Sequence, residues 1–158
     1  MATMAWPHDW ELRRRGKDCV LCATLGRGDN DHIVAVTQLP DSEVWLERRS
    51  RLPGYCVVVW RHGHVAEPTE LSAEQAAGYW RDVLAVSRAI ETEFRPVKMN
   101  LMMLGNTVPH LHTHVVPRYL DDPAPAGPIP WPAMFNDQAT DPDVLRHQAQ
   151  ALRAALSA

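Results

Sequence analysis

The sequence has few cysteines, no long apolar run and little net charge, and each absence excludes a class of protein. Three cysteines in 158 residues are too few, and odd in number, for a disulfide-rich secreted scaffold. No apolar run approaches the roughly 20 residues of a membrane span, and the N-terminus lacks the apolar segment of a signal peptide. A net charge of −3 gives no support for an extended nucleic-acid surface. We therefore expect a protein of the reducing cytoplasm, with no membrane and no nucleic-acid partner.

The length and composition are those of one ordinary globular domain. Apolar residues make up 46% of the chain and charged residues 22%, values typical of such domains. At 158 residues the chain can bury a single hydrophobic core. We expect one domain over residues 1–158, with its core at about 30–120 and a Pro-rich segment plus a C-terminal helix at 121–158.

The hydrophobic pattern predicts an α+β fold. Ser72 and Gln75 fit a capping box, which predicts the start of a main helix that Pro96 ends. Behind the box, apolar residues recur at three- and four-residue steps and predict an apolar stripe that includes Trp80. A second helix is expected to begin at residues 140–143. Alternating or β-branched stretches predict strands at 32–39, 43–49, 55–61, 98–104 and 109–118. The expected architecture is an antiparallel sheet of about five strands with one main helix and a C-terminal helix.

Three alternating histidines in the last predicted strand raise the functional question. Side chains two residues apart in a strand share one face, so His110, His112 and His114 are expected to line one side. Three imidazoles with ordinary pKa values of about 6.5 crowd one another there, which is costly unless a site uses them. The pattern therefore indicates a functional site more than a structural one.

Three interpretations of the histidines compete. An imidazole can attack a phosphoryl group and hold it covalently while its neighbours supply hydrogen bonds or protons. Alternatively, the histidines bind a metal ion, although no Asp or Glu between residues 98 and 120 is present to complete such a site. The third interpretation is structural, with imidazoles bonded to backbone groups. Covalent catalysis at phosphorus is the interpretation that the pattern favours.

The turn before the histidines also favours chemistry at a phosphate group. Gly105, Asn106 and Thr107 offer backbone N–H groups, an amide and a hydroxyl, with no acidic side chain. Such donors suit phosphate oxygens and the charge that develops on them. By itself the segment is also an ordinary tight turn, so it gains its meaning from the adjacent histidines.

The run from His110 to Val116 resembles the histidine triad (HIT) signature, His-φ-His-φ-His-φ-φ, with Thr113 as its one semi-polar departure. Residues 98–109 before it and Arg118-Tyr119 after it also look like bacterial members, and the resemblance covers about the middle two-thirds of the chain. It implies a HIT-like fold and cleavage at the α-phosphate of a nucleotide conjugate, such as a nucleoside phosphoramidate or a dinucleoside polyphosphate. It also implies a homodimer.

The resemblance assigns roles to individual residues. His112 would be the nucleophile that forms a nucleotidyl-histidine, and His114 would contact the α-phosphate or the departing group. His110 would support the site or, in some relatives, bind a metal. The remaining implied residues contact phosphate or shape the pocket: Asn100, Gly105, Asn106 and Thr107.

A Cys-x-x-Cys pair near the N-terminus is the second chemical signal. Cys19 and Cys22 have the spacing of half a structural zinc site. Zinc-containing HIT relatives carry further ligands at the positions of His64 and His110, so the resemblance implies a closed site of two cysteines and two histidines. The alternative is an idle thiol pair beside an exposed turn. The proposed chemistry itself requires no cofactor.

Two other functions remain open at this point. One is a nucleotide-binding or sensing protein with little turnover, and the other is a metal-dependent hydrolase that uses the histidine strand. The role of the Pro-rich segment at 121–132 is also open, because it either covers the pocket or a partner subunit, or simply connects elements at the surface.

Overall fold

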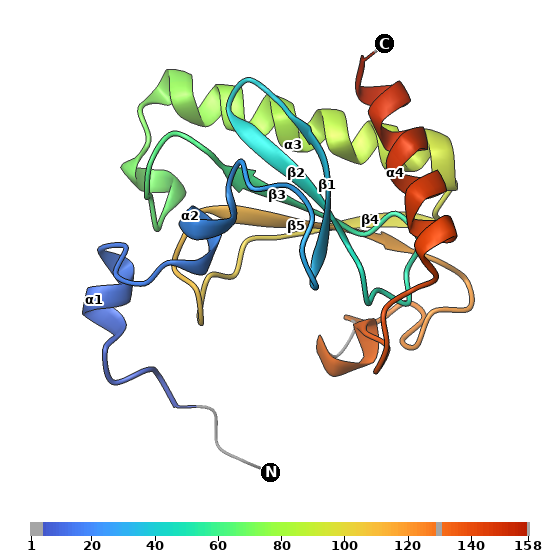
Figure 1. Ribbon diagram of the computed structural model, residues 1–158, viewed down its shortest axis with the longest axis horizontal. Coiled ribbons are helices and arrows are strands. Elements are labelled where there is room, and N and C mark those ends of the chain that lie inside the picture. Colours follow the sequence, from blue (N-terminus) through green and yellow to red (C-terminus); the bar gives the residue numbers. More distant parts are fainter. Residues whose placement is uncertain (1–4, 129–130, 158) are drawn as a thin grey trace.

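A five-stranded antiparallel sheet lies at the centre of the structure, a computed structural model that describes residues 5–128 and 131–157 (Figure 1). Its strand order is β1-β2-β3-β5-β4. The strands are β1 (Ile33–Gln38), β2 (Ser42–Glu47), β3 (Cys56–Trp60), β4 (Lys98–Met102) and β5 (His112–Arg118). The expected α+β architecture is confirmed.

The histidine strand begins later than the sequence pattern predicts. Strand β5 starts at His112, so His110 lies in the segment before it and not within the ladder. Pro109 has no N–H to donate, and the His110 N–H turns back to the Val108 carbonyl at 2.8 Å. The expectation of three histidines in one continuous strand was therefore wrong for His110, while His112 and His114 share a face as expected.

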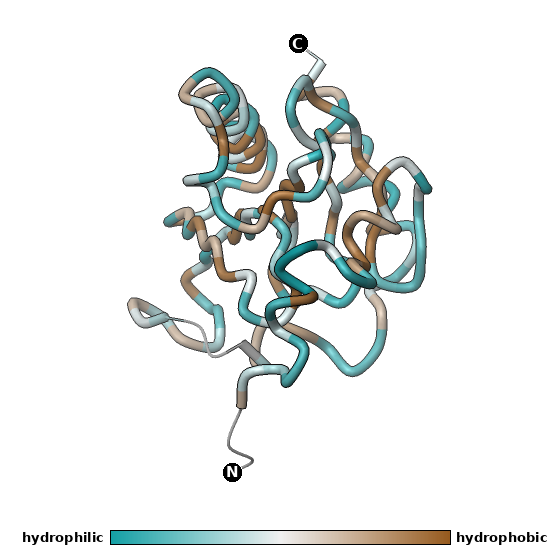
Figure 2. Tube along the Cα trace, turned by 90° about the vertical axis from the view of Figure 1, so that its left-hand side faces the viewer, coloured by the Kyte–Doolittle hydropathy of each residue, from teal (hydrophilic) through white to brown (hydrophobic). Residues whose placement is uncertain are grey.

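The main helix, α3 (Ala73–Phe94), covers one face of the sheet. It begins at the predicted capping box, in which Ser72 Oγ accepts the Gln75 N–H at 3.2 Å and Gln75 Oε1 accepts the Ser72 N–H at 2.9 Å. Its apolar side turns toward the rest of the molecule (Figure 2). Trp80, expected on that apolar stripe, is instead 42% exposed.

The C-terminal helix, α4 (Pro142–Ser157), packs against α3 and β1. Its buried residues are Leu145, Ala149 and Leu152, which recur at three- and four-residue steps on one side. The apolar core between this pair of helices and the sheet includes Val58, Val83, Val86, Ile90 and Val115.

The opposite face of the sheet is covered by short segments. Helices α1 (Trp10–Arg14) and α2 (Val20–Thr24) lie on the side away from α3 (Figure 1). Leu21 and Leu25, at and just after α2, pack on a second apolar cluster of this face, which includes Trp45, Val57 and Met134. The site histidines His112 and His114 are on this face, since they pair with Val59 and Val57.

The chain after β5 turns sharply at a buried ion pair. Arg118 Nε donates to Asp122 Oδ2 at 2.7 Å, and the Asp122 side chain is 1% exposed. Arg118 Nη2 also donates to the Ala124 carbonyl at 2.6 Å, so the first part of the Pro-rich segment is folded against the strand end. Residues 129–130 of that segment lie outside the described residues. The short helices η1 (Pro68–Glu70) and η2 (Trp131–Met134) complete the described elements.

None of the helices in the described ranges is both long enough and apolar enough to cross a membrane.

Candidate active site

His112 lies at the start of β5 with one ring nitrogen fixed by the backbone. Its Nδ1 is 2.6 Å from the carbonyl oxygen of His110. A carbonyl oxygen only accepts, so this contact assigns the ring proton to Nδ1 and leaves the lone pair on Nε2. Burial lowers the pKa of His112, which favours the neutral ring. A neutral imidazole with its lone pair on Nε2 is the form that can act as a nucleophile.

His114 lies beside His112 on the same face of β5. The two ring centroids are 4.9 Å apart and the rings are nearly perpendicular, at 79°. His114 is 9% exposed, and burial, together with the neighbouring His112, lowers the pKa of His114 to about 3. Both imidazoles are therefore neutral near pH 7.

Tyr55 is a site residue that the sequence interpretation missed. Its hydroxyl lies 2.7 Å from Nδ1 of His114, and the residue is 1% exposed. The sequence marks Tyr55 only as the first residue of an apolar stretch after Pro53 and Gly54. Its proximity to His114 depends on the pairing of β3 with β5, which joins chain segments 59 residues apart.

The predicted phosphate-binding turn lies between β4 and β5. Gly105 has a φ of +70°, a conformation that favours glycine, and Asn106 and Thr107 are exposed. The turn therefore presents its amide and hydroxyl groups to solvent just before the site histidines.

Asn100 is held inside the protein fold. It pairs with Val116, which places it on the histidine face of the sheet. Its Oδ1 accepts the Arg118 Nη1–H at 2.7 Å. Its contact with a ligand stays a prediction.

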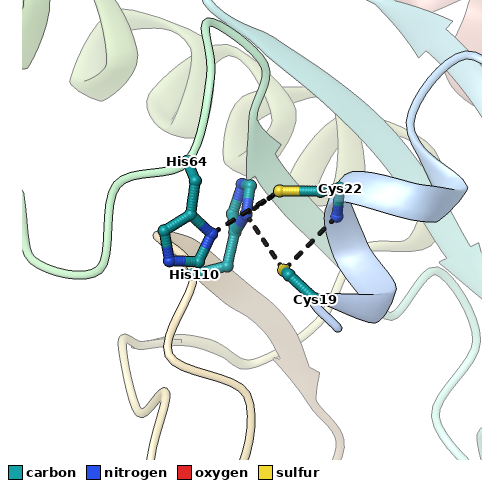
Figure 3. Close-up of side chains that lie close together, drawn as sticks. All are labelled: Cys19, Cys22, His64 and His110. Carbon is teal, nitrogen blue, oxygen red and sulfur yellow. Dashed lines mark hydrogen bonds between the residues drawn. The ribbon is translucent and has the colours of Figure 1, made fainter. Parts of the chain in front are cut away.

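His110 faces the two N-terminal cysteines, as the resemblance implied. Its Nδ1 is 3.2 Å from Cys22 Sγ and 3.5 Å from Cys19 Sγ, and His64 Nδ1 is 3.5 Å from Cys22 Sγ. The four ligand atoms all lie within 4.8 Å of one another. Figure 3 shows the four side chains pointing toward a common centre. We call these four residues the Cys/His cluster.

The hydrogen bonds of the Cys/His cluster prepare both imidazoles for a metal ion. His110 Nε2 donates to the Trp60 carbonyl at 2.8 Å, and His64 Nε2 donates to the Arg14 carbonyl at 3.1 Å. Each bond places the ring proton on Nε2 and turns the Nδ1 lone pair toward the sulfurs. Tetrahedral zinc with bond lengths of about 2.0–2.3 Å separates its ligand atoms by about 3.3–3.8 Å, close to the three nitrogen–sulfur distances given above. The residues present therefore fit a zinc ion.

The Cys22 thiol of the cluster ionises with difficulty on its own. Burial, together with the adjacent Cys19, raises the pKa of Cys22 to about 11. Burial also lowers the pKa of His110. Near pH 7 the Cys22 thiol and the His110 ring are thus neutral, and a bound cation would favour the thiolates.

Comparison with known protein families decides which fold family this arrangement represents. The model of the HIT domain matches residues 29–121, more than half of the chain. The chain belongs to the HIT family. The resemblance drawn from the histidine motif is confirmed, and the sheet with its covering helices is the HIT fold.

Among solved structures, the HIT fold of this chain is similar to a histidine triad protein of Bradyrhizobium japonicum. The match has a TM-score of 0.70 and 25% identity, and covers 97% of this chain and 99% of that chain. A zinc-bound histidine triad family protein of Mycobacterium smegmatis matches with a TM-score of 0.63 and 23% identity, over 89% of this chain and 94% of that one.

Among curated proteins, bis(5'-adenosyl)-triphosphatase of Saccharomyces cerevisiae is 27% identical over 73 residues. The match covers 43% of this HIT chain and 35% of the yeast protein, so the chain spans about a third of that relative's length.

Proposed function

We propose that this protein is a hydrolase or nucleotidyl transferase that cleaves nucleotide conjugates at the α-phosphate through a nucleotidyl-His112 intermediate. One observation carries the proposal. His112 Nδ1 is bonded to the His110 carbonyl at 2.6 Å, so its Nε2 lone pair is available for attack on phosphorus. The bond keeps the ring oriented during the reaction, because the same proton stays on Nδ1 before and after attack.

Neighbouring groups supply the other roles in the proposed reaction. The turn at Gly105, Asn106 and Thr107, whose last two residues are exposed, offers donors for phosphate oxygens. His114 lies next to His112 and would hydrogen-bond the α-phosphate or the departing group. Asn100 would shape the pocket from β4. Water then attacks phosphorus and releases the nucleoside monophosphate.

The substrate class is proposed from the site and from the relatives together. A dinucleoside polyphosphate is supported by the activity in the name of the yeast relative. A nucleoside phosphoramidate is the other member of the proposed class, because its cleavage would begin with the same attack by His112 on the α-phosphate.

We also propose that Cys19, Cys22, His64 and His110 hold a structural zinc ion. The closed set of four ligand atoms and the zinc-bound HIT relative support it. When bound, zinc would cross-link the N-terminal segment to the sheet and stabilise the fold. We expect about one equivalent of zinc by elemental analysis of protein purified without a metal-affinity tag, and much less in Cys22→Ser. Wild-type protein without zinc would contradict this assignment.

Two alternative functions receive less support. A metal-dependent hydrolase needs an open coordination position, whereas the Cys/His cluster supplies four protein ligands and uses the side chain of His110 for them. A nucleotide sensor with little turnover would use the same pocket, and only kinetics separates it from an enzyme.

The proposed assembly is a homodimer in the cytoplasm. Strand β4 is an edge of the sheet, and Val97, Met103 and Leu104 at its two ends are exposed. A reducing compartment would keep the cysteines free for metal. Light scattering that gives a monomer mass would contradict the dimer.

The deciding experiment is turnover with chelator present. Wild type and His112→Ala would receive diadenosine polyphosphates and adenosine phosphoramidate, with the guanosine counterparts, and acid quenching would trap any nucleotidyl-protein. Chelator-resistant release of nucleoside monophosphate, absent in His112→Ala, is expected. Tight binding without turnover would favour the sensor, and loss of turnover on chelation while the protein stays folded would favour the metal enzyme.

A further inference from the structure

Tyr55 contacts the reacting face of the site through a single buried hydrogen bond. Its hydroxyl meets His114 Nδ1 at 2.7 Å, and its ring packs beside Phe135, with centroids 6.1 Å apart. Among the residues that the structure describes, the hydroxyl has no second hydrogen-bond partner. The contact therefore acts on His114 and on no other polar group of the described chain.

The direction of this hydrogen bond follows from the surroundings of the hydroxyl. Burial, together with the nearby Glu47 carboxylate, raises the pKa of Tyr55 far above its usual range, so the hydroxyl keeps its proton. A buried O–H without a bonded acceptor is costly, and Nδ1 of His114 is the acceptor within reach. The hydroxyl therefore donates to Nδ1, and the ring proton of His114 lies on Nε2.

This tautomer limits what His114 can do for a leaving group. A neutral Nε2–H donates a hydrogen bond readily but gives up its proton only if Nδ1 gains one. That proton would come from the Tyr55 hydroxyl, which resists ionisation. The pair of residues is thus suited to stabilise negative charge and poorly suited to act as a general acid.

We propose that Tyr55 is a positioning residue that holds His114 as a neutral Nε2–H donor, and that the site therefore favours leaving groups that depart as oxyanions. The favoured substrates are phosphoric anhydrides, which release a phosphate or polyphosphate, over phosphoramidates, which release an amine. This inference rests on the proposed function and narrows its substrate class.

The chemical step needs no proton transfer to the leaving group. The Nε2 lone pair of His112 forms a bond to the α-phosphorus, and the bond from phosphorus to the bridging oxygen breaks. That electron pair stays on the oxygen, which leaves as a phosphate oxyanion and accepts a hydrogen bond from His114 Nε2–H. Water then forms a bond to phosphorus and releases a proton to solvent, while the N–P electron pair returns to His112. An amine, in contrast, must be protonated as it departs.

The test compares two variants that each lose one buried tyrosine hydroxyl. Tyr55→Phe removes the bond to His114, and Tyr79→Phe removes a hydroxyl on the other face, which bonds the Val58 carbonyl at 3.0 Å and Thr113 Oγ1 at 2.8 Å. We expect Tyr55→Phe to lower kcat on diadenosine triphosphate about 10- to 100-fold with little change in KM. Tyr79→Phe should lower stability and leave kcat unchanged.

Nitrogen-15 NMR of the imidazoles gives a second readout that a purely structural role would not change. In wild type, the His114 signals should be those of the Nε2–H tautomer, and in Tyr55→Phe those of a mixture. Wild type should also turn over diadenosine triphosphate at least about 10-fold faster than adenosine phosphoramidate, since general-acid assistance is worth about 100-fold or more.

The outcomes separate this inference from the proposed function. Equal kcat and an unchanged His114 tautomer in Tyr55→Phe would overturn the positioning role, and faster phosphoramidate turnover would overturn the leaving-group preference. If wild type turns over neither substrate and forms no nucleotidyl-His112, the proposed function and the leaving-group preference both fail. The NMR spectrum of wild type would still decide the tautomer of His114, and an Nδ1–H signal would refute the role of Tyr55.

Discussion

The two faces of the sheet are both buried, but by different means. The face toward α3 is covered by one long helix and is mainly apolar, and the Tyr79 hydroxyl on it bonds to groups of the same face. The opposite face carries titratable groups and is covered by short segments from both ends of the chain. One long helix can supply a continuous apolar stripe, whereas short segments can leave room for a ligand.

Four consecutive residues of strand β5 show the difference between the two faces. Thr113 and Val115 point to the helix face and are 0% exposed, while His112 and His114 point to the other face. Under the proposed function, stability and chemistry thus depend on alternate residues of one strand. Substitutions on the two sides should therefore separate loss of activity from loss of stability.

The largest expected effect is on turnover, at His112. We expect His112→Ala to lower kcat at least about a thousand-fold, about 4 kcal/mol in activation free energy, because the covalent intermediate cannot form. The free energy of unfolding should change by about 1 kcal/mol or less, because the ring is only half-buried. Steady-state kinetics and urea unfolding on the same preparation measure both. Full turnover by the folded variant would show that His112 is not the nucleophile.

The helix face should respond in the opposite way. Ile90 of α3 is 0% exposed, so Ile90→Ala leaves a cavity and should lower the free energy of unfolding by about 2–5 kcal/mol. Turnover per folded molecule should stay within about twofold, measured where the variant is fully folded. A large loss of kcat with intact stability would contradict the division between the faces.

The pH dependence of stability should come from the site face. The pKa of His114 is about 3 in the folded protein and about 6.5 in an unfolded chain. As the pH falls below 6.5, the unfolded chain gains a proton that the folded protein does not bind, so stability decreases by about 1.4 kcal/mol per pH unit from this group. His114→Asn should flatten the dependence by that amount between pH 6 and 4, in urea titrations. An unchanged slope would show that His114 is not buried as a neutral ring.

The smallest effect is expected at Thr113. Thr113→Val removes the hydroxyl that meets Tyr79, but Tyr79 still donates to the Val58 carbonyl. The expected loss is about 1 kcal/mol of stability, with no change in kcat or in the pH slope. Thr113→Val is thus the matched control for the substitutions at His112 and His114. A change in its kcat would contradict the separation of activity and stability between the two faces.

Much of the fold was predictable because its signals are local. The capping box of Ser72 and Gln75 and the apolar stripe behind it specify where α3 begins and which side it buries. The prediction that Trp80 belongs to the buried stripe was wrong. Trp80 lies at the edge of the apolar stripe, where a side chain can still be exposed to solvent.

The candidate site was predictable in part. His112 and His114 share a face because strand periodicity is local, but His110 leaves the strand, since Pro109 interrupts the ladder. The partner of His114 was not predicted, because Tyr55 meets it only through pairing of strands that are far apart in sequence.

The sequence by itself determined the histidine motif, the main helices and strands, and the residue types of the Cys/His cluster. The motif and the cluster follow from residue identity, and the helices and strands follow from short-range periodicity. Only the tertiary structure decided which nitrogen each imidazole presents. His110 and His64 turn Nδ1 to the sulfurs because the carbonyls of Trp60 and Arg14, each 50 residues away, accept their Nε2–H groups. His112 keeps its proton on Nδ1 because the carbonyl of His110, two residues earlier, accepts it. The Trp60 and Arg14 carbonyls are positioned by strand pairing and loop geometry, and no local pattern in the chain specifies their contacts with the two histidines.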